Sequence, residues 1–158
     1  MFYLVDGHNL IPKLGLRLES LDDEEELIRR LQEYCRLRRA RLEVYFDGAL
    51  PGTASKRAAG ALTAYFIRQG SSADAALESR LARLGRQARN WTVVSSDRRV
   101  QQSARAAHAA VLSSEEFAGE ISRIEAAGIS KLKGEATLAP EEVEEWLKEF
   151  DRRRGHQH

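Results

Sequence analysis

The sequence predicts a three-layer α/β/α domain in which helices cover both faces of a parallel sheet of about five strands. Short runs of aliphatic, aromatic and β-branched residues alternate with longer segments of helical periodicity. Several of these runs are continuously apolar, which is typical of strands buried on both faces, and the segments between them are long enough for parallel crossovers. The expected strands are residues 2–5, 42–46, 62–67, 91–95 and 109–112.

Capping residues mark where helices between these strands begin. Residues 22–39 have apolar positions at helical spacing, and Asp22 with Glu25 three residues later forms a candidate capping box. The first turn of this segment is acidic and its last turn is rich in arginine, as the helix dipole favours. Ser113 and Glu116 form a second candidate capping box, which predicts that a helix follows the last strand.

Residues 1–127 are expected to form one domain, and residues 128–158 a separate C-terminal segment. A chain of 158 residues is long enough to bury one hydrophobic core. Residues 128–139 have little apolar periodicity and are predicted to form a connecting arm. Pro140 suits the first turn of a C-terminal helix that would follow this arm.

The charges of the chain are almost balanced. The sequence has 25 Lys and Arg against 24 Asp and Glu, so no global field attracts nucleic acid or membranes, and a polyanion would have to be bound by a local patch. The lone Cys35 excludes a disulfide framework and is expected to be a small buried hydrophobe. Because no apolar run could span a bilayer and no leader precedes Phe2, we expect a cytoplasmic protein without a membrane partner.

Four aspartates follow the expected strands at the places where ligands bind in open α/β sheets. Asp6 ends the first strand, Asp47 ends the second and Asp97 follows the fourth. Asp74 lies where the helix after the third strand begins. Taken singly, each has an ordinary explanation as a turn residue or a helix cap. Because the carboxyl ends of parallel strands meet at one edge of a sheet, we expect the four side chains to lie close together.

Such a cluster favours binding of a divalent cation. Two carboxylates about 5 Å apart repel by roughly 3 kcal/mol at an effective dielectric near 20, so the group must either hold protons or bind a cation. Oxygen ligands without a supporting set of Cys or His favour Mg²⁺ or Mn²⁺ over zinc. A cation at such a site can bind a phosphate oxygen and lower the pKa of an attacking water, which predicts phosphodiester hydrolysis.

Polar residues beside the aspartates have candidate supporting roles. Asn9 could order a water or ligate a metal weakly, or be a loop residue, and His8 could donate to phosphate or be ordinary polar surface. Ser95 and Ser96 could donate hydrogen bonds to phosphate or to the aspartates, or satisfy the backbone. Glu78 lies one helical turn after Asp74 and is a further candidate ligand, unless it pairs with a neighbouring arginine.

Four motifs, in this order, resemble the NYN branch of the PIN-like nucleases, and within it the YacP-like bacterial group. The motifs are Leu4-Val5-Asp6-Gly7-His8-Asn9-Leu10-Ile11, Val44-Tyr45-Phe46-Asp47-Gly48, Ser72-Ala73-Asp74 and Val94-Ser95-Ser96-Asp97, within residues 2–125. The resemblance implies a PIN-like fold, an acidic metal site and endoribonuclease activity.

The resemblance maps three aspartates, Asp6, Asp74 and Asp97, onto the acidic positions of the family, with Asn9 and Asp47 beside them. It implies RNA as the substrate, whether messenger, transfer or ribosomal. One branch of the family acts on messenger RNA in association with the ribosome, which makes the translating ribosome a candidate partner. Many PIN domains have another acidic residue on a helix, and no residue of 22–26 is its clear equivalent. Asp47 or Glu78 could substitute for it, so the number of metal ions stays open.

RNA binding at this edge would need basic residues around the acidic centre. Such residues can position phosphates without reading the base sequence, although most arginines of any domain belong simply to its solvated surface. The candidates lie after the second and third expected strands, on the helix expected at 74–89 and after the fourth strand: Lys56, Arg57, Arg68, Arg80, Arg98 and Arg99.

Two other classes of function remain open at this point. A non-catalytic module that binds RNA or the ribosome could share the fold, although a binder of polyanions gains nothing from clustered negative charge. A phosphatase with Asp6 as nucleophile would need a second Asp two positions on, where this chain has His8. The metal-dependent endoribonuclease is the function that the sequence favours, and the oligomeric state stays undetermined.

Overall fold

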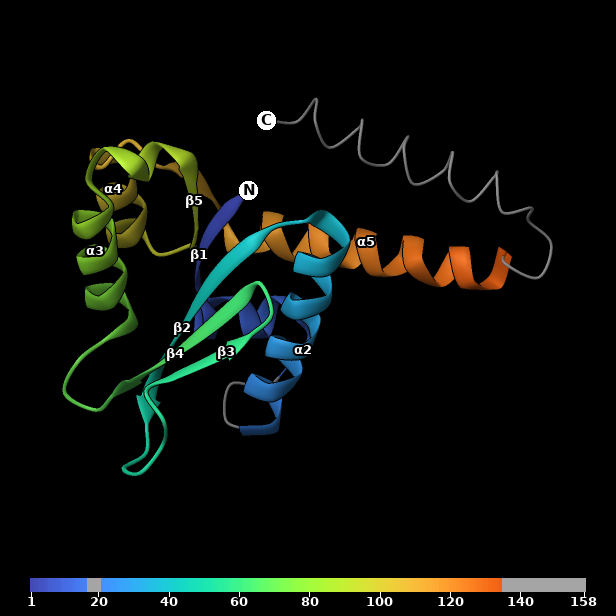
Figure 1. Ribbon diagram of the computed structural model, residues 1–158, viewed down its shortest axis with the longest axis horizontal. Coiled ribbons are helices and arrows are strands. Elements are labelled where there is room, and N and C mark those ends of the chain that lie inside the picture. Colours follow the sequence, from blue (N-terminus) through green and yellow to red (C-terminus); the bar gives the residue numbers. More distant parts are fainter. Residues whose placement is uncertain (17–20, 135–158) are drawn as a thin grey trace. The chain divides into compact units, whose positions relative to one another are not determined.

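A six-stranded sheet forms the centre of the computed structural model, which describes residues 1–16 and 21–134 (Figure 1). The strand order is β3-β4-β2-β1-β5-β6, and all neighbours pair in parallel except β3 and β4, which are antiparallel. The predicted α/β class with a parallel sheet is therefore confirmed. The strands are β1 Phe2–Asp6, β2 Arg41–Ala49, β3 Lys56–Ala59, β4 Leu62–Arg68, β5 Trp91–Val94 and β6 Ala110–Leu112.

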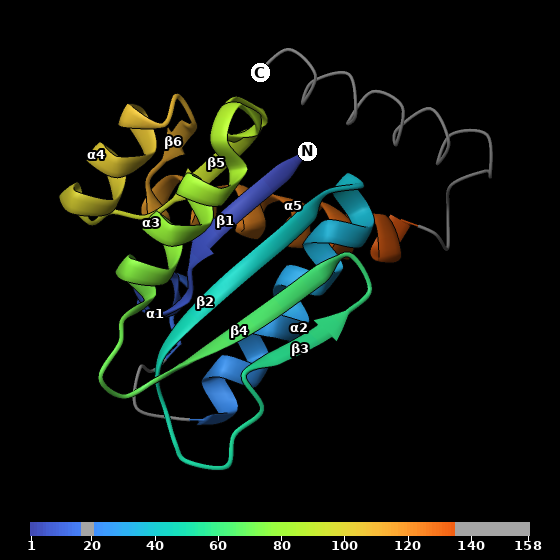
Figure 2. The same ribbon diagram turned by 60° about the vertical axis from the view of Figure 1, so that its left-hand side comes forward.

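Helices cover both faces of the sheet (Figure 2), with α3 and α4 on one side and α2 on the other. The chain forms a short helix and a 3-10 turn directly after β1, a second 3-10 turn after α3, and a long helix after β6. The helical elements are α1 Gly7–Leu10, η1 Ile11–Leu14, α2 Leu21–Arg38, α3 Ala73–Leu84, η2 Gly85–Asn90, α4 Arg98–Ala106 and α5 Ser114–Gly134.

Alternate residues of the central strand β1 supply the core on the two faces of the sheet. Leu4 is fully buried in a cluster with residues of α3 and α4, such as Leu77 and Val100. Tyr3 points to the opposite face, where its ring lies 6.0 Å from that of Tyr34 on α2 and 5.2 Å from that of Phe117. This alternation fixes the direction in which β1 delivers Asp6 at its end.

The structure confirms one predicted capping box and corrects the other. The hydroxyl of Ser113 donates to the Glu116 carboxylate at 2.9 Å and accepts from the Glu116 backbone N–H at 3.1 Å, as expected. Asp22 instead lies inside the first turn of α2, which begins at Leu21, so its predicted role as the N-cap is wrong. The helix expected at residues 74–89 is shorter than predicted. Helix α3 ends at Leu84, and the chain continues as η2.

The predicted connecting arm is helical in its first part. Helix α5 runs through residue 128 to Gly134, so the expectation of an irregular arm from residue 128 is wrong for this stretch. The rest of that arm and the helix expected after Pro140 lie outside the described residues. Residues Met1–Ile121 form one compact unit, and the predicted boundary after residue 127 stays a prediction. No helix of the described segments is long and apolar enough to cross a membrane.

Candidate active site

The four aspartates lie at the carboxyl edge of the parallel strands or in the first turns of the helices that leave it. Asp6 is the last residue of β1 and only 7% exposed. Asp47 lies near the end of β2, where the pairing with β4 shifts register between Phe46 and Ala49. Asp74 is in the first turn of α3, and Asp97 is the N-cap of α4.

Shared negative charge links these carboxylates. The pKa of Asp6 is raised to about 6, first by burial and then by the charges of Asp74 and Asp47, while the Asn9 backbone N–H and the Ser95 hydroxyl lower it. The pKa of Asp74 is also raised, by partial burial and then by the nearby Asp97 and Asp47 carboxylates. A cation among the four side chains would relieve both effects, which is the electrostatic condition for a metal site.

The carboxylates nevertheless do not form a finished coordination site. Across residues 1–16 and 21–134, no three His, Cys, Asp or Glu side chains already converge as metal ligands. The set still fits Mg²⁺ or Mn²⁺ in its chemistry, because its donors are hard carboxylate oxygens.

Two of the aspartates also hold the backbone in place. Asp47 accepts a hydrogen bond from the Ala73 backbone N–H. Asp97 caps α4 by accepting from the N–H groups of Arg99 at 2.8 Å and Val100 at 3.4 Å. The helix-cap role weighed for Asp97 is therefore real, whereas Asp47 holds a backbone group far along the chain, a role that differs from the turn weighed from the sequence.

Asp74, in contrast, does not cap its helix. The cap of α3 is Ser72, whose hydroxyl accepts from the Ala75 N–H at 3.1 Å. No hydrogen bond to the Asp74 carboxylate comes from the residues that the structure describes, so this side chain is available to a ligand.

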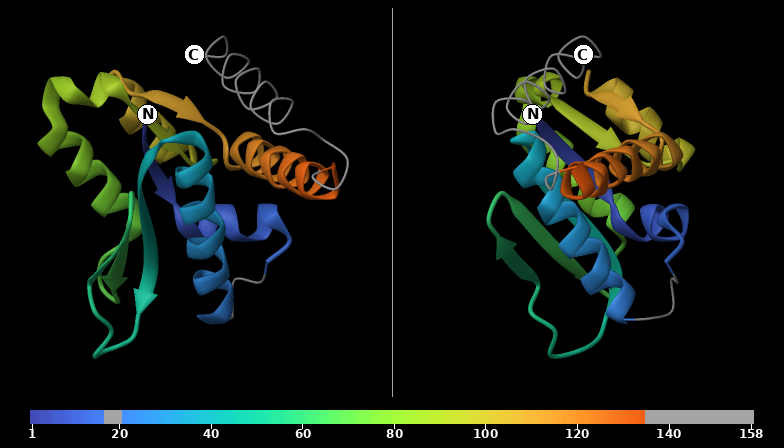
Figure 3. Two further views of the ribbon diagram at one scale, coloured as in Figure 1. Left: turned by 45° about the vertical axis from the view of Figure 1, so that its right-hand side comes forward. Right: turned by 90° about the vertical axis from the view of Figure 1, so that its right-hand side faces the viewer.

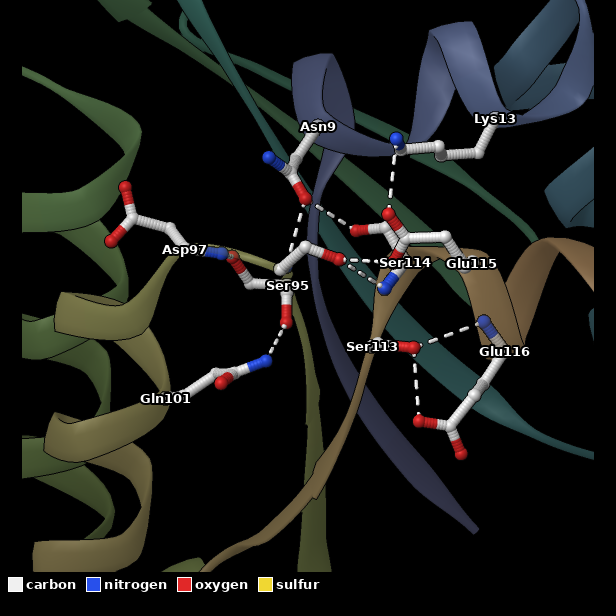
Figure 4. Close-up of polar contacts among 10 residues, drawn as sticks. Asn9, Lys13, Ser95, Asp97, Gln101, Ser113, Ser114, Glu115 and Glu116 are labelled. Atoms are coloured by element: carbon white, nitrogen blue, oxygen red, sulfur yellow. Dashed lines mark hydrogen bonds and ion pairs between the residues drawn. The ribbon is translucent and has the colours of Figure 1, made fainter.

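Asn9 is held by two hydrogen bonds to its side-chain oxygen (Figure 4). Oδ1 accepts from the Ser96 backbone N–H at 2.8 Å and from the Ser114 hydroxyl at 2.6 Å. The amide orientation is fixed, because a backbone N–H can only donate and must face the oxygen. Both lone pairs of Oδ1 are then used, and of the two roles weighed for Asn9, the ordering of a water fits this arrangement better than ligation of a metal. Its free Nδ2 can still donate to a water or a phosphate oxygen.

Ser95 connects two of the aspartates. It is fully buried, and its hydroxyl donates to Asp6 Oδ2 at 3.4 Å while it accepts from the Asp97 backbone N–H at 3.1 Å. Its carbonyl oxygen accepts from the side-chain amide of Gln101 on α4 at 2.8 Å. Donation to an aspartate and satisfaction of the backbone, two of the roles weighed for this serine, are thus both present.

Ser96 belongs to a separate network that the sequence did not indicate. Its hydroxyl donates to Glu115 Oε2 at 2.5 Å and accepts from the Ser114 N–H at 3.0 Å. Lys13 on η1 pairs with the other oxygen of Glu115 at 3.0 Å, and these two partners lower the pKa of Glu115 to about 2. The network ties the start of α5 to the loop after β5, and both of its hydrogen bonds use the Ser96 hydroxyl.

His8 is more than polar surface. Its Nε2 lies 2.8 Å from Glu24 Oε2 on α2, and its ring lies 5.5 Å from that of Phe46. The hydrogen bond to Glu24 raises the pKa of His8 against the opposing effect of burial, and Asp47 and Asp6 add to the rise. Glu24 therefore affects the site by holding His8 and raising its pKa. The spacing of residues 22–26 in the sequence could not reveal this contact.

Several of the expected RNA-binding residues and the candidate ligand Glu78 are engaged in ion pairs. Glu78 accepts hydrogen bonds from Arg99 at 2.8 and 3.2 Å. Pairing with an arginine was the alternative to metal ligation for this residue. Arg57 makes two hydrogen bonds to Glu25, at 2.7 and 2.9 Å. Arg80 binds both oxygens of Glu43 and lies half-buried over the Trp91 ring, so its guanidinium is held within the domain.

The other three expected basic residues are less committed. Lys56 on β3 lies 6.0 Å from the centre of the Tyr65 ring, a weak contact at an exposed position. Arg68 ends β4 and Arg98 begins α4, and both are exposed. None of these three has an ion-pair partner in the part of the chain that the structure describes.

A comparison with known sequences decides the family. The sequence pattern of the YacP-like NYN domain matches residues 3–154 of this chain. The chain belongs to the YacP-like NYN family. This confirms the resemblance seen in the four motifs, and the match continues well past residue 125, where the motifs stop. No curated protein sequence matches the chain.

Two solved structures of one YacP protein resemble this YacP-like NYN chain. The crystal structure of Rae1 (YacP) from Bacillus subtilis has 25% sequence identity, a TM-score of 0.65, and covers 98% of this chain and 94% of that chain. The structure of a tryptophan-to-leucine mutant of the same protein has 21% identity, a TM-score of 0.69, and covers 93% of this chain and 90% of that chain. These similarities confirm the PIN-like fold of a nuclease-type domain.

Proposed function

We propose that this chain is a metal-dependent endoribonuclease that hydrolyses phosphodiester bonds of RNA. The observation that carries the proposal is the raised pKa of Asp6, a carboxylate buried at the end of the central strand and facing the charges of Asp74 and Asp47. No basic side chain of the described residues pairs with Asp6, and a fold that keeps such a group is suited to a bound cation. Membership in a nuclease-type family gives that cation a phosphodiester substrate.

The residues of the chain divide the proposed work among them. Asp6, Asp74 and Asp97 would hold Mg²⁺ or Mn²⁺, with Asp47 as a further ligand or a support. When bound, the cation supplies a lowered pKa for an attacking water and charge stabilisation for the leaving oxygen. Asn9 would donate through Nδ2 to that water or to a phosphate oxygen.

The surrounding side chains would position the RNA. His8 carries a raised pKa because of Glu24, which favours the imidazolium form that would donate to phosphate. Lys56, Arg68 and Arg98 would contact phosphates without reading the base sequence. The fully buried Ser95 would hold Asp6 and Asp97 in position relative to each other.

Cleavage of a labelled structured RNA in Mn²⁺ tests this function. Wild type should cut and lose activity in EDTA, whereas Asp97→Asn should lose about 100-fold or more. Asn is as good an N-cap as Asp, so this variant removes the charge without removing the cap of α4. Glu33→Gln, an exposed carboxylate that pairs with Arg36 on α2, is the matched control and should cut like wild type. RNA binding without cleavage by any form would instead support the non-catalytic binding module.

Messenger RNA on the translating ribosome is the specific substrate we propose, on the strength of the family resemblance, and it would place the activity in the cytoplasm. Co-sedimentation of the Asp97→Asn variant with ribosomes tests the association without degrading the message. Recovery of the variant only in the ribosome-free fraction would contradict it, while leaving RNA cleavage itself to the preceding experiment.

A further inference from the structure

The positive charge of this chain is concentrated in one segment. Residues 79–114 contain seven arginines and a single acidic residue, Asp97, although the whole chain has a net charge of only +1. Three of these arginines, Arg80, Arg98 and Arg99, were considered above. The other four form a set that we call the distal arginine cluster: Arg83, Arg86, Arg89 and Arg105.

The distal arginine cluster lies at the far ends of the two helices that begin at the aspartates. Helix α3 starts beside Asp74 and helix α4 starts at Asp97, and they lie side by side on one face of the sheet (Figures 2 and 3). Arg83 and Arg105 belong to the last turns of these helices. At 1.5 Å per residue, the 12 residues of α3 place its end about 18 Å from its start.

The members of the cluster are exposed, and two of them border a hollow in the surface. Arg86 and Arg89 on η2 line a surface hollow together with His108, which follows α4, and no acidic side chain lines it. A second hollow beside it is also lined by Arg86 and Arg89. The surface therefore offers two arginines at a concave area that a phosphate backbone can enter, with two further arginines of the cluster at the ends of the neighbouring helices.

Several other arginines of the described residues are paired, unlike the cluster. Arg29, Arg36 and Arg57 each pair with a glutamate. Within residues 1–16 and 21–134, no carboxylate pairs with any member of the distal arginine cluster. Like charges gathered without counter-charges repel one another, and a bound polyanion removes that repulsion.

We propose that the distal arginine cluster binds the phosphate backbone of the RNA substrate several nucleotides away from the bond that is cut. This inference rests on the proposed function. RNA fits better than a single small anion because exposed arginines lie at both ends of α4, Arg98 at the acidic edge and Arg105 in the last turn. The distance of about 18 Å corresponds to about five nucleotide steps of a stacked strand at 3.4 Å each. A nuclease that holds its substrate at both places gains affinity for long RNA without contacting more bases.

The test compares two double variants that lose the same charge, Arg86→Gln with Arg89→Gln in the cluster and Arg29→Gln with Arg36→Gln on α2. Both are made in the full-length Asp97→Asn chain, so that RNA is bound but not cut. Fluorescence anisotropy with a labelled single-stranded RNA of about 25 nucleotides is measured over a salt series. The cluster variant should weaken binding about tenfold and lower the slope of log K against log salt by about 1.4, because each single-strand phosphate contact contributes about 0.7. The α2 variant should match its parent.

Equal affinities and salt slopes for the two double variants would overturn the proposal. Binding of anionic phospholipid vesicles that depends on the cluster, with RNA binding unchanged, would overturn it in favour of a membrane partner. In the cleavage-competent chain, the cluster variant should lose kcat/KM on the long RNA and keep it on an RNA of about four nucleotides, which is too short to reach both places. If the wild type bound RNA through the cluster but cut no RNA, the result would support the distal binding site and refute the proposed nuclease activity.

Discussion

Asp47 accepts a hydrogen bond from the backbone N–H of Ala73, the first residue of α3. This contact joins the end of one central strand to the start of a helix on one face of the sheet. The next residue along the helix is Asp74, whose carboxylate is among the charges that raise the pKa of Asp6. One carboxylate of the cluster thus sets the position of another, so Asp47 has a structural role besides any contact with a cation.

Asp47→Ala should therefore destabilise the fold more than Asp47→Asn does. Alanine leaves the Ala73 N–H without its acceptor, at a cost of about 1 to 3 kcal/mol, whereas asparagine keeps an oxygen at this position. Both variants remove the charge, so both should weaken Mn²⁺ binding. Urea unfolding of the metal-free proteins measures the difference, and equal midpoints for the two variants would show that this hydrogen bond does not hold α3.

Gly7→Ala should destabilise the protein by about 1 to 3 kcal/mol, because it overpacks the core. A Cβ at this position would lie 2.5 Å from Cε1 of the Phe46 ring and 3.0 Å from the Tyr45 carbonyl oxygen. Phe46 cannot easily move aside, since it is fully buried and stacked on Phe66 at 5.5 Å.

The matched control for this change is Gly119→Ala on α5, where a Cβ would meet nothing within 4 Å. Alanine there should stabilise the helix by about 0.5 to 1 kcal/mol. Thermal unfolding compares the two variants with wild type. A Gly7→Ala variant as stable as wild type would show that the β1–α1 junction tolerates a side chain.

Glu24→Gln should lower the pKa of His8. The raised pKa means that His8 stabilises the fold below its ordinary pKa of 6.5, and that this contribution is lost as pH rises through the raised value. Without the Glu24 charge, burial remains and favours the neutral ring. The His8 ring resonance, followed by NMR over a pH series, should titrate at lower pH in this variant, while Glu33→Gln on the same helix should leave it unchanged. An identical titration in all three proteins would contradict the coupling.

The metal-free protein should lose stability as pH rises from about 4 to about 6. The folded state holds the Asp6 proton up to a pKa of about 6, whereas the unfolded chain releases it near its ordinary value of 3.8, so ionisation favours unfolding across this window. With about 1.4 kcal/mol per pKa unit, the contribution is about 2 to 3 kcal/mol. Urea unfolding in EDTA should show this slope for wild type and lose it for Asp6→Asn, which should be the more stable protein at pH 7. If the free energy of unfolding had the same pH dependence in wild type and in Asp6→Asn, this role of Asp6 would be refuted.

Much of the fold and the placement of the aspartates could be predicted from the sequence, because both follow from local pattern. Continuous apolar runs identified the buried parallel strands, and the rule that their carboxyl ends share an edge placed Asp6 and Asp97. Strand β3 was missed since Lys56–Ala59 contains two charged and two small residues. It is a strand only because it pairs with β4.

The partners of the site residues could not be predicted in the same way, because they come from distant parts of the sequence. Ser114, which fixes the amide of Asn9, is 105 residues away along the chain. Glu24, which raises the pKa of His8, comes from a helix with several acidic residues and nothing local to distinguish it. Helix α5 passes residue 128 although the apolar pattern weakens there, since extending an existing helix costs little.

A crystal structure of the full chain soaked in Mn²⁺ tests the central claim most directly. Anomalous scattering locates the ion without any assumption about activity. We expect a peak among the four aspartates, with carboxylate oxygens of Asp6, Asp74 and Asp97 about 2.0 to 2.2 Å from it. Strong Mn²⁺ peaks elsewhere with none at this edge, in a protein whose RNA cleavage needs Mn²⁺, would contradict the assignment of these aspartates as the metal site.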